Sequence, residues 1–373
     1  MKNLEKEHLK IAMLGHKRIP SREGGVEIVV EELSTRMVSM GYDVTCFNRA
    51  KKHQGNRPAI RQHKGVKIKT VPTVDRKGCA AASSSVTGAI AAAFGKYDVV
   101  HFHAEGPCAM LWLPKLFGKR CIATIHGLDH QRAKWGRFAR AYILLGEKCA
   151  VKFADEIIVL SKGVQQYFLD TYNRETVFIP NGVTQPEIRK ADEIVKSYGL
   201  DKNGYILFLG RLVPEKGITY LIDAFKNVKT DKKLVIAGGS SNTDAFVEEL
   251  HELAAQDERI LFTGFVQGQM LEELYSNAYV YVLPSDLEGM PLSLLEAMSC
   301  GNCCVTSDIE ECASVVDENG LTFPKGNVEA LQELLQNLCD QPDTVRKYQA
   351  VSAPYVTQKY NWDDVTMRTL ELY

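Results

Sequence analysis

The sequence lacks the features that carry a chain across a membrane or hold it together with disulfides. No run of about 18 apolar residues occurs in its 373 residues, so no segment is predicted to span a membrane as a helix. Residues 1–10 are polar and charged, unlike a secretory signal. The ten cysteines are scattered, several within apolar runs, which favours a reduced cytoplasmic protein over a disulfide framework. We expect a cytoplasmic location, and contact with the inner face of the cell membrane stays open.

Metal-binding and nucleic-acid motifs are missing as well. No Asp-x-Asp motif stands in a suitable place to hold a metal, and Cys300-x-x-Cys303 has no second pair to complete a zinc site. His101 and His103 share one face of a predicted strand, but Glu105 is the only carboxylate near them. No recognised nucleic-acid motif is present. We therefore expect no metal, no cofactor and no nucleic-acid partner.

The length and the charge distribution indicate two dissimilar halves. A chain of 373 residues exceeds what one hydrophobic core usually supports, so two domains are expected. Residues 1–183 hold 29 Lys and Arg against 16 Asp and Glu, a net charge of +13, and the remainder holds 16 against 30, or −14. The basic half is suited to an anionic partner such as a lipid headgroup or a phosphorylated acceptor. Attraction between the two halves is the alternative.

Short apolar runs alternate with helical patterns along the whole chain, which predicts parallel sheets covered on both faces. The predicted strands are 10–14, 43–47, 66–71, 98–103, 121–125, 156–160, 176–179, 205–209, 233–237, 259–262, 279–283, 303–306 and 321–323. The main predicted helices are 26–40, 221–229, 243–256 and 328–338, and the Ala- and Ser-rich segment 79–94 reads as a helix or a loop, with the helix favoured.

The pattern predicts an α/β protein of two Rossmann-like, doubly wound domains that face a cleft. The alternation of apolar runs and helical patterns is interrupted at 181–192, where Pro and Gly cluster. We place a basic N-terminal domain at 1–183, an acidic C-terminal domain at 184–354 and a final helix at 355–373. Ligands of open parallel sheets bind beyond the carboxyl ends of the strands, so the residues that follow the strands are the candidates for function.

The strongest motif follows the predicted strand 279–283 and contains Glu288 and Glu296. Pro291 suits the first turn of a helix, and Gly301 suits the position after its end. The loop at Gly289 would then present backbone amides at a helix N-terminus, which favours an anion such as a diphosphate. A carboxylate there is suited to accepting hydrogen bonds from sugar hydroxyls. The plainer alternative is that Glu288 caps the helix and Glu296 is solvated.

In this context the Glu-x7-Glu spacing resembles the family-4 retaining nucleotide-sugar glycosyltransferases of the GT-B fold. The resemblance covers nearly the whole chain. It implies that Glu288 contacts hydroxyls of the donor sugar and that Glu296 contacts the ribose. It also implies backbone contacts to the sugar and the diphosphate from Gly289, Met290, Pro291 and Leu292. In the family a C-terminal helix crosses back onto the first domain.

A second matching motif, Gly210-Arg211 to Lys216-Gly217, follows the predicted strand 205–209. Arg and Lys at such a turn can neutralise the charge that develops on a nucleoside-diphosphate leaving group. The resemblance assigns that role to Arg211 and Lys216. An exposed turn with ordinary surface charges is the alternative.

Two stretches of the first half and one of the second complete the resemblance. Gly24-Gly25 opens the predicted helix 26–40 and can let backbone approach a phosphate closely, although a Gly-Gly turn alone is weak evidence. His126 ends a predicted strand and can donate to a sugar hydroxyl or a phosphate, although a lone His is more often structural. The family places these residues by the donor and places Val266 by the nucleotide base. His126 and Glu288 are the candidates for the reacting centre.

The stretch from Arg132 to Phe153, which includes Lys134, reads as a basic amphipathic helix. Peripheral contact with anionic lipid and burial of its aromatic face on the sheet are equally compatible with the pattern. The runs 103–107 and 127–135 resemble a bacterial subgroup associated with cell-surface polysaccharide assembly.

Together these motifs predict a retaining glycosyltransferase that moves a hexosyl or deoxyhexosyl group from a nucleoside-diphosphate sugar to a glycan or lipid-linked acceptor. The resemblance implies that no metal is required. Two alternatives stay open on the same architecture. One is a nucleotide-sugar epimerase, and the other is a non-catalytic regulatory or binding subunit.

Overall fold

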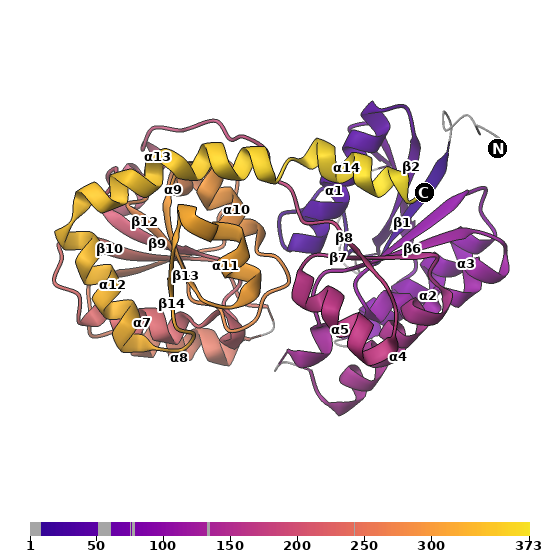
Figure 1. The fold of residues 1–373 in the computed structure, drawn as a ribbon, viewed down its shortest axis with the longest axis horizontal. Coiled ribbons are helices and arrows are strands. Elements are labelled where there is room, and N and C mark those ends of the chain that lie inside the picture. Colours follow the sequence, from indigo (N-terminus) through magenta and orange to yellow (C-terminus); the bar gives the residue numbers. More distant parts are fainter. Residues whose placement is uncertain (1–8, 51–60, 75, 77–78, 133–134, 242) are drawn as a thin grey trace. The chain divides into compact units, whose positions relative to one another are not determined.

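A computed structural model describes residues 9–50, 61–74, 76, 79–132, 135–241 and 243–373 (Figure 1). The described chain forms two compact units, each built on one sheet. The first unit comprises the chain up to Asn181 together with Trp362–Tyr373, and the second is Gly182–Asn361. The polar start of the chain, residues 1–8, and Lys134 of the basic stretch lie outside the described residues.

Among the described residues, the sheet of the first unit has eight strands in the order β3-β4-β2-β1-β5-β6-β7-β8. All neighbours pair in parallel except β3, which is antiparallel to β4. The strands are β1 (Lys10–Leu14), β2 (Asp43–Arg49), β3 (Gln62–His63), β4 (Val66–Val71), β5 (Val99–His103), β6 (Arg120–Ile125), β7 (Glu156–Val159) and β8 (Val177–Phe178). The two-residue strand β3 was not predicted, because two residues carry no periodicity.

Helices cover both faces of this sheet (Figure 1). On one face a buried apolar cluster joins Phe102 and Ala123 of the strands to Ala89, Ala150 and Phe168 of the helices. The helical segments of this unit are α1 (Gly25–Ser39), α2 (Cys79–Ala93), η1 (Gly106–Met110), α3 (Trp112–Leu116), η2 (Asp129–Gln131), α4 (Arg137–Phe153), α5 (Lys162–Tyr172) and α14 (Trp362–Glu371). The segment 79–94 is therefore a helix. Its small side chains allow close packing, since Gly88 lies against Leu14.

The described sheet of the second unit is fully parallel, in the order β11-β10-β9-β12-β13-β14. Its strands are β9 (Tyr205–Leu209), β10 (Lys233–Ala237), β11 (Ile260–Gly264), β12 (Val280–Leu283), β13 (Cys303–Ser307) and β14 (Leu321–Phe323). Its helical segments are α6 (Glu193–Tyr198), η3 (Pro214–Lys216), α7 (Ile218–Lys226), α8 (Asp244–Ala254), α9 (Gln269–Asn277), α10 (Leu292–Ser299), α11 (Glu310–Val316), η4 (Asp317–Asn319), α12 (Val328–Asp340) and α13 (Pro342–Lys359). The prediction of two Rossmann-like α/β domains is confirmed.

The predicted limits of the final segment need correction. The stretch 355–359 is the end of α13 and packs in the second unit, where Val356 is buried. The chain leaves helical geometry at Tyr360, and only Trp362 onward joins the first unit. There α14 packs on α1, and Arg36 donates to Asp363 at 2.8 Å. The division between the units also falls at Asn181 rather than at 183.

Candidate functional site

The carboxyl ends of β9 and β12 are neighbours in the second unit, although β10 and β11 come between them in the sequence. The winding of the sheet reverses between these two strands, and open parallel sheets bind ligands beyond the carboxyl ends of the strands at such a reversal. The two strongest sequence motifs start there, since Gly210 follows β9 and Pro284 follows β12.

Gly217 lets the turn after β9 lie directly against the segment after β12. Its φ is +63°, and a Cβ atom at this position would lie 2.0 Å from the carbonyl oxygen of Pro284. The two segments are also hydrogen-bonded. The backbone N–H of Asp286 donates to the carbonyl of Glu215 at 2.9 Å, and the hydroxyl of Tyr220 donates to the Asp286 carboxylate at 3.1 Å. Only glycine fits this contact without displacing the backbone.

This contact brings together Lys216 and Glu288, two of the predicted site residues. Lys216 Nζ lies 2.5 Å from Glu288 Oε1, and the side chains are only 10% and 9% exposed. The same Glu288 oxygen accepts a hydrogen bond from the hydroxyl of buried Ser285 at 2.7 Å. Glu288 is therefore a fixed carboxylate next to a fixed ammonium, rather than a helix cap. The pair offers an acceptor for hydroxyl groups beside a cation for a phosphate.

The loop from Gly289 to Pro291 leads into α10. Pro291 is the N-cap residue, so the helix begins one residue later than predicted, at Leu292. No side chain caps this end, and all four residues 289–292 are buried. An uncapped helix start with buried glycine and proline before it is suited to present backbone N–H groups to an anion. As predicted, Gly301 follows the end of the helix, with φ +78°.

Glu296 lies on α10 in hydrogen-bond contact with Tyr275 of α9. The Tyr275 hydroxyl donates to Glu296 Oε2 at 3.1 Å. Burial, together with the nearby Glu296, raises the pKa of Tyr275 well above its ordinary value, so the phenol stays protonated and acts as a donor. Glu296 is half-buried rather than fully solvated, and Tyr275 holds its carboxylate in a defined orientation.

The structure places Arg211 and Val266 at the same edge of the sheet. Arg211 comes directly after Gly210, whose carbonyl is so close to Gly238 that a Cβ atom there would lie 1.7 Å from it. Val266 is half-buried and follows β11, which is separated from β9 by β10. Arg211 therefore belongs beside Lys216 along the sheet edge, while Val266 lies two strands away from β9.

In the first unit the predicted Gly24-Gly25 opens α1. Gly24 is the N-cap residue with extended backbone and no side-chain cap. A Cβ atom on Gly24 would lie 2.3 Å from Oε2 of buried Glu27, whose other oxygen, Oε1, accepts a hydrogen bond from the Lys17 N–H at 2.8 Å. Gly24 thus makes room for the Glu27 carboxylate at the start of α1.

His126 ends a row of aromatic rings that sequence analysis did not find. Tyr373 OH lies 2.6 Å from His101 Nδ1, and the ring of His101 stacks on that of His103 at 4.3 Å. His103 Nδ1 in turn lies 3.1 Å from His126 Nε2. The other ring nitrogen of His101 lies 2.7 Å from the hydroxyl of Thr124. The row connects the C-terminal residue to His126 through the interior of the unit.

Burial keeps these rings neutral. It lowers the pKa of His101 to about 3 and that of His126 to about 4, and it lowers the pKa of His103 as well. For His126 the neighbouring Arg132 lowers the pKa further, against the opposing effect of Asp129. His126 is therefore a neutral hydrogen-bonding group near pH 7 and not a cation for a phosphate.

Two family models match the chain. The model described as Glycosyltransferase Family 4 matches residues 23–185, and the model described as Glycosyl transferases group 1 matches residues 190–352. The chain belongs to the family-4 glycosyltransferases. This match selects transfer over the epimerase and the non-catalytic subunit that the sequence left open. The chain is a glycosyltransferase of the GT-B fold that uses a nucleotide sugar.

This glycosyltransferase is similar to several named relatives and to solved structures. It is 29% identical to the alpha-maltose-1-phosphate synthase of Mycolicibacterium smegmatis, over 74% of this chain and 78% of that protein. It is also 29% identical to the O-antigen chain mannosyltransferase B of Escherichia coli, over 48% of each chain. Its fold is similar to that of Anabaena Alr3699/HepE in complex with UDP and glucose, with a TM-score of 0.80, 16% identity and coverage of 98% and 99% of the two chains.

The basic stretch of this glycosyltransferase differs from the prediction in its limits. The helix α4 begins at Arg137, and the described chain before it contains the short 3₁₀ turn η2. One face of α4 is buried at Ile143 and Ala150, while Phe138 is 95% exposed and Leu145 is 52% exposed. The helix thus packs on the core and also leaves large apolar side chains uncovered. Among the described helices, none combines the length and the apolar character needed to cross a bilayer.

Glu105, the only carboxylate that the sequence places near His101 and His103, belongs to a polar group that the sequence did not predict. Its side chain meets His130 and Glu147 in the first unit. Sequence spacing could not reveal this group, because its members come from three different elements and lie 25 and 17 residues apart.

Proposed function

We propose that this enzyme transfers a hexosyl or deoxyhexosyl group from a nucleoside-diphosphate sugar to a hydroxyl of a glycan or lipid-linked acceptor, with retention of anomeric configuration, in cell-surface polysaccharide assembly. The observation that carries the proposal is the buried contact between Lys216 and Glu288 at the carboxyl edge of the second sheet. Transfer needs a group that accepts hydrogen bonds from the sugar hydroxyls and a positively charged group beside the departing diphosphate. Glu288 supplies the first and Lys216 the second.

In this proposal the second unit binds the donor and the first unit serves the acceptor. Arg211 and Lys216 hold the diphosphate, aided by the backbone from Gly289 to Leu292 at the start of α10. Glu288 accepts hydrogen bonds from the sugar hydroxyls. Glu296, oriented by Tyr275, accepts hydrogen bonds from the ribose, and Val266 lies by the base.

Gly24, Gly25 and His126 contribute from the first unit. Because His126 is neutral, its role is to hydrogen-bond the sugar or the diphosphate rather than to add positive charge. The acceptor hydroxyl attacks the anomeric carbon from the face that the diphosphate leaves, and a diphosphate oxygen takes its proton. This route needs no enzyme nucleophile and no metal at the diphosphate, since Arg211 and Lys216 supply the positive charge.

We also propose a cytoplasmic enzyme that contacts the inner face of the cell membrane through α4. Arg137, Arg140, Lys148 and Lys152 are exposed on the helix that leaves Phe138 uncovered. Basic residues beside exposed apolar ones favour anionic lipid surfaces. Such contact would suit a lipid-linked acceptor, and the relative named for O-antigen chain synthesis supports the surface-polysaccharide role.

The test is a thermal-shift measurement of the full chain with UDP, GDP, dTDP and ADP. A ligand of the folded state stabilises it by about 2.7 kcal/mol at 100 times its Kd. We expect one diphosphate to raise the melting temperature, with the rise reduced in Arg211→Ala and Glu296→Ala and kept in the exposed control Lys196→Ala. The affinity of the chain for this diphosphate should be the same with and without added Mg²⁺. Absence of any shift at millimolar nucleotide would refute the donor site, and an inverted anomer in the product would refute retention.

A further inference from the structure

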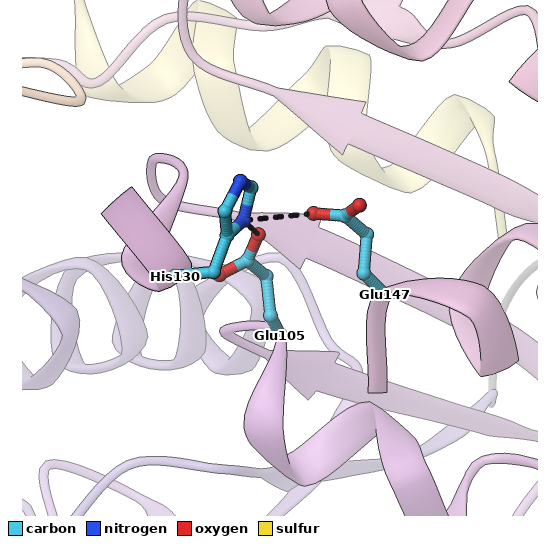
Figure 2. Close-up of side chains that lie close together, drawn as sticks. All are labelled: Glu105, His130 and Glu147. Carbon is cyan, nitrogen blue, oxygen red and sulfur yellow. Dashed lines mark ion pairs between the residues drawn. The ribbon is translucent and has the colours of Figure 1, made fainter. Parts of the chain in front are cut away.

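Three polar side chains meet in the interior of the first unit, and none of them is assigned to the donor. Glu105 follows β5, His130 lies in η2 and Glu147 lies in α4 (Figure 2). Ala104, at φ +72°, turns the chain after β5, and α4 approaches so closely that a Cβ atom on Gly146 would lie 2.0 Å from the Glu105 carbonyl oxygen. The backbone itself therefore brings the two carboxylates together.

One atom of each side chain points toward the other two (Figure 2). His130 Nδ1 lies 3.6 Å from Glu105 Oε1 and 3.4 Å from Glu147 Oε2, and the three atoms all lie within 4.8 Å of one another. Both carboxylates are fully buried, and His130 is 16% exposed. Among the described residues, none of these three atoms has a hydrogen-bond partner outside the group.

The remaining oxygen of each carboxylate is held from outside the group. The backbone N–H of Asp129 donates to Glu105 Oε2 at 2.8 Å. The hydroxyl of Tyr167 donates to Glu147 Oε1 at 2.9 Å, and the hydroxyl of Tyr172 donates to the same oxygen. Carboxylates that bind metals are typically oriented in this way by a second set of hydrogen bonds, which leaves one oxygen directed at the ion.

The distances within the group fit a shared ion better than direct hydrogen bonds. Hydrogen bonds of this type measure about 2.7–3.2 Å between heavy atoms. Nitrogen and oxygen ligands lie about 2.0–2.2 Å from Zn²⁺, so the edge of a zinc tetrahedron measures about 3.4 Å. The separations of 3.4 and 3.6 Å match that edge. Two buried carboxylates without a partner cation would also repel each other at short range.

We propose that Glu105, His130 and Glu147 bind one divalent first-row transition ion, with Zn²⁺ as the best match to one imidazole nitrogen and two carboxylate oxygens. Imidazole selects against Mg²⁺ and Ca²⁺, which take oxygen ligands. The ion ties β5, η2 and α4 together and so steadies the segment that runs from His126 to His130. It is a structural and positioning site, and none of its three ligands is among the residues proposed to bind the donor.

The proton is the competing occupant. Burial, and next a side-chain hydrogen bond with Glu147, raise the pKa of Glu105 to about 10, so an ion-free chain would carry a proton there. A shared proton would draw the two carboxylates into one short hydrogen bond and would bind no metal. Measurement of bound metal therefore shows directly whether a metal ion or a proton occupies the group.

The experiment is metal analysis and Zn²⁺ binding on the full-length chain, without nucleotide, so that failure of the donor proposal does not affect it. We expect about one Zn²⁺ per chain in the wild type and loss of that ion in Glu147→Gln. The matched control is Glu31→Gln, which alters a carboxylate that already has His63 as a direct partner at 2.9 Å. Tyr167→Phe keeps all three ligands and should weaken Zn²⁺ binding about 10- to 100-fold.

Cobalt substitution of the wild type identifies the ligands without any variant. Ten cysteines offer an alternative zinc site, and thiolate ligation gives Co²⁺ intense sulfur charge-transfer bands. The proposal predicts d–d bands of a low-coordinate nitrogen and oxygen site without those sulfur bands. Sulfur bands, the absence of a stoichiometric ion, or full Zn²⁺ affinity in both Glu147→Gln and Tyr167→Phe would each overturn it.

Discussion

Lys216 and Glu288 are 72 residues apart in the sequence and form an ion pair of 2.5 Å in the second unit. The contact depends on Gly217, which lets two strand-to-helix turns touch, and on Ser285, which donates to the same carboxylate oxygen. A buried ion pair is weak evidence for stability, because desolvation opposes the attraction. Its place at the sheet reversal argues instead for a role in binding the donor.

Loss of either member of the pair should reduce turnover strongly. We expect Lys216→Met and Glu288→Gln each to lower kcat/KM about 10²- to 10³-fold, the usual cost of removing one group that stabilises charge in the transition state. Steady-state kinetics with the donor found by the nucleotide panel measures this. Lys196→Ala, which removes an exposed ammonium paired with Asp192, should leave kcat/KM unchanged. Near-normal turnover in both buried variants would remove the pair from the mechanism.

Two glycines of the second unit share a backbone conformation and differ in their surroundings. Gly217 has φ +63° and faces the Pro284 carbonyl, whereas Gly199 has φ +60° and only the Lys233 ammonium within 4 Å. Both alanine variants incur the left-handed penalty of roughly 1–2 kcal/mol. Gly217→Ala adds a clash with backbone, worth about 1–3 kcal/mol more. Thermal or denaturant unfolding should show the larger loss at Gly217, and equal losses would contradict the close contact.

Acid should destabilise the first unit through its buried histidines. Burial lowers the pKa of His101 to about 3 and that of His16 to about 4. Between these values and about 6.5, the unfolded chain binds protons that the folded chain excludes, so stability is complete above that window and falls as the pH drops through it. The loss is roughly 2 kcal/mol per histidine at pH 5.

Unfolding measured between pH 7.5 and 4.5 tests this effect. His101→Gln should flatten the dependence, while substitution of the exposed His251 by Gln should leave it unchanged. Carboxylates contribute equally to wild type and variant, so the difference between them isolates His101. An unchanged slope in His101→Gln would mean that this ring accepts a proton in the folded chain.

The exposed apolar side chains of α4 should control membrane contact. We expect the double variant Phe138→Ser and Leu145→Ser to weaken binding to vesicles of anionic lipid at least about tenfold, since each inserted side chain contributes about 1.5–3 kcal/mol. Leu169→Ser is the matched control, because that leucine is 42% exposed on α5. Vesicle co-sedimentation at two salt concentrations measures it. Equal binding by wild type and double variant would exclude α4 as the contact.

Most elements could be predicted because buried parallel strands leave a strong local signal. The strands β1, β4, β9, β10 and β14 have the predicted limits, and the other predicted strands differ by one or two residues at one or both ends. The missed strand and the wrong helix start both lie in short segments. Strand β3 is two residues long, and the helix of the basic stretch begins only at Arg137, after the 3₁₀ turn η2.

Proximity across the chain was harder to predict. The placement of Lys216 and Glu288 at strand ends was visible, since each follows an apolar run, but their direct contact depends on β9 and β12 being neighbours. The partners of His101 and Glu105 left no local pattern. Tyr373 comes from the far end of the chain. Glu147 lies on α4, and nothing in the residue pattern of that helix indicates a contact with Glu105.

The sequence by itself determined the fold class, the family and the residues that follow the strands, because apolar periodicity and glycine placement are local properties of the chain. Only the tertiary structure decided that Lys216 pairs with Glu288, that His126 is neutral, and that Glu105, His130 and Glu147 converge. Those outcomes depend on strand order, on burial and on close backbone contacts at glycines. Each of these arises between segments that are distant in sequence.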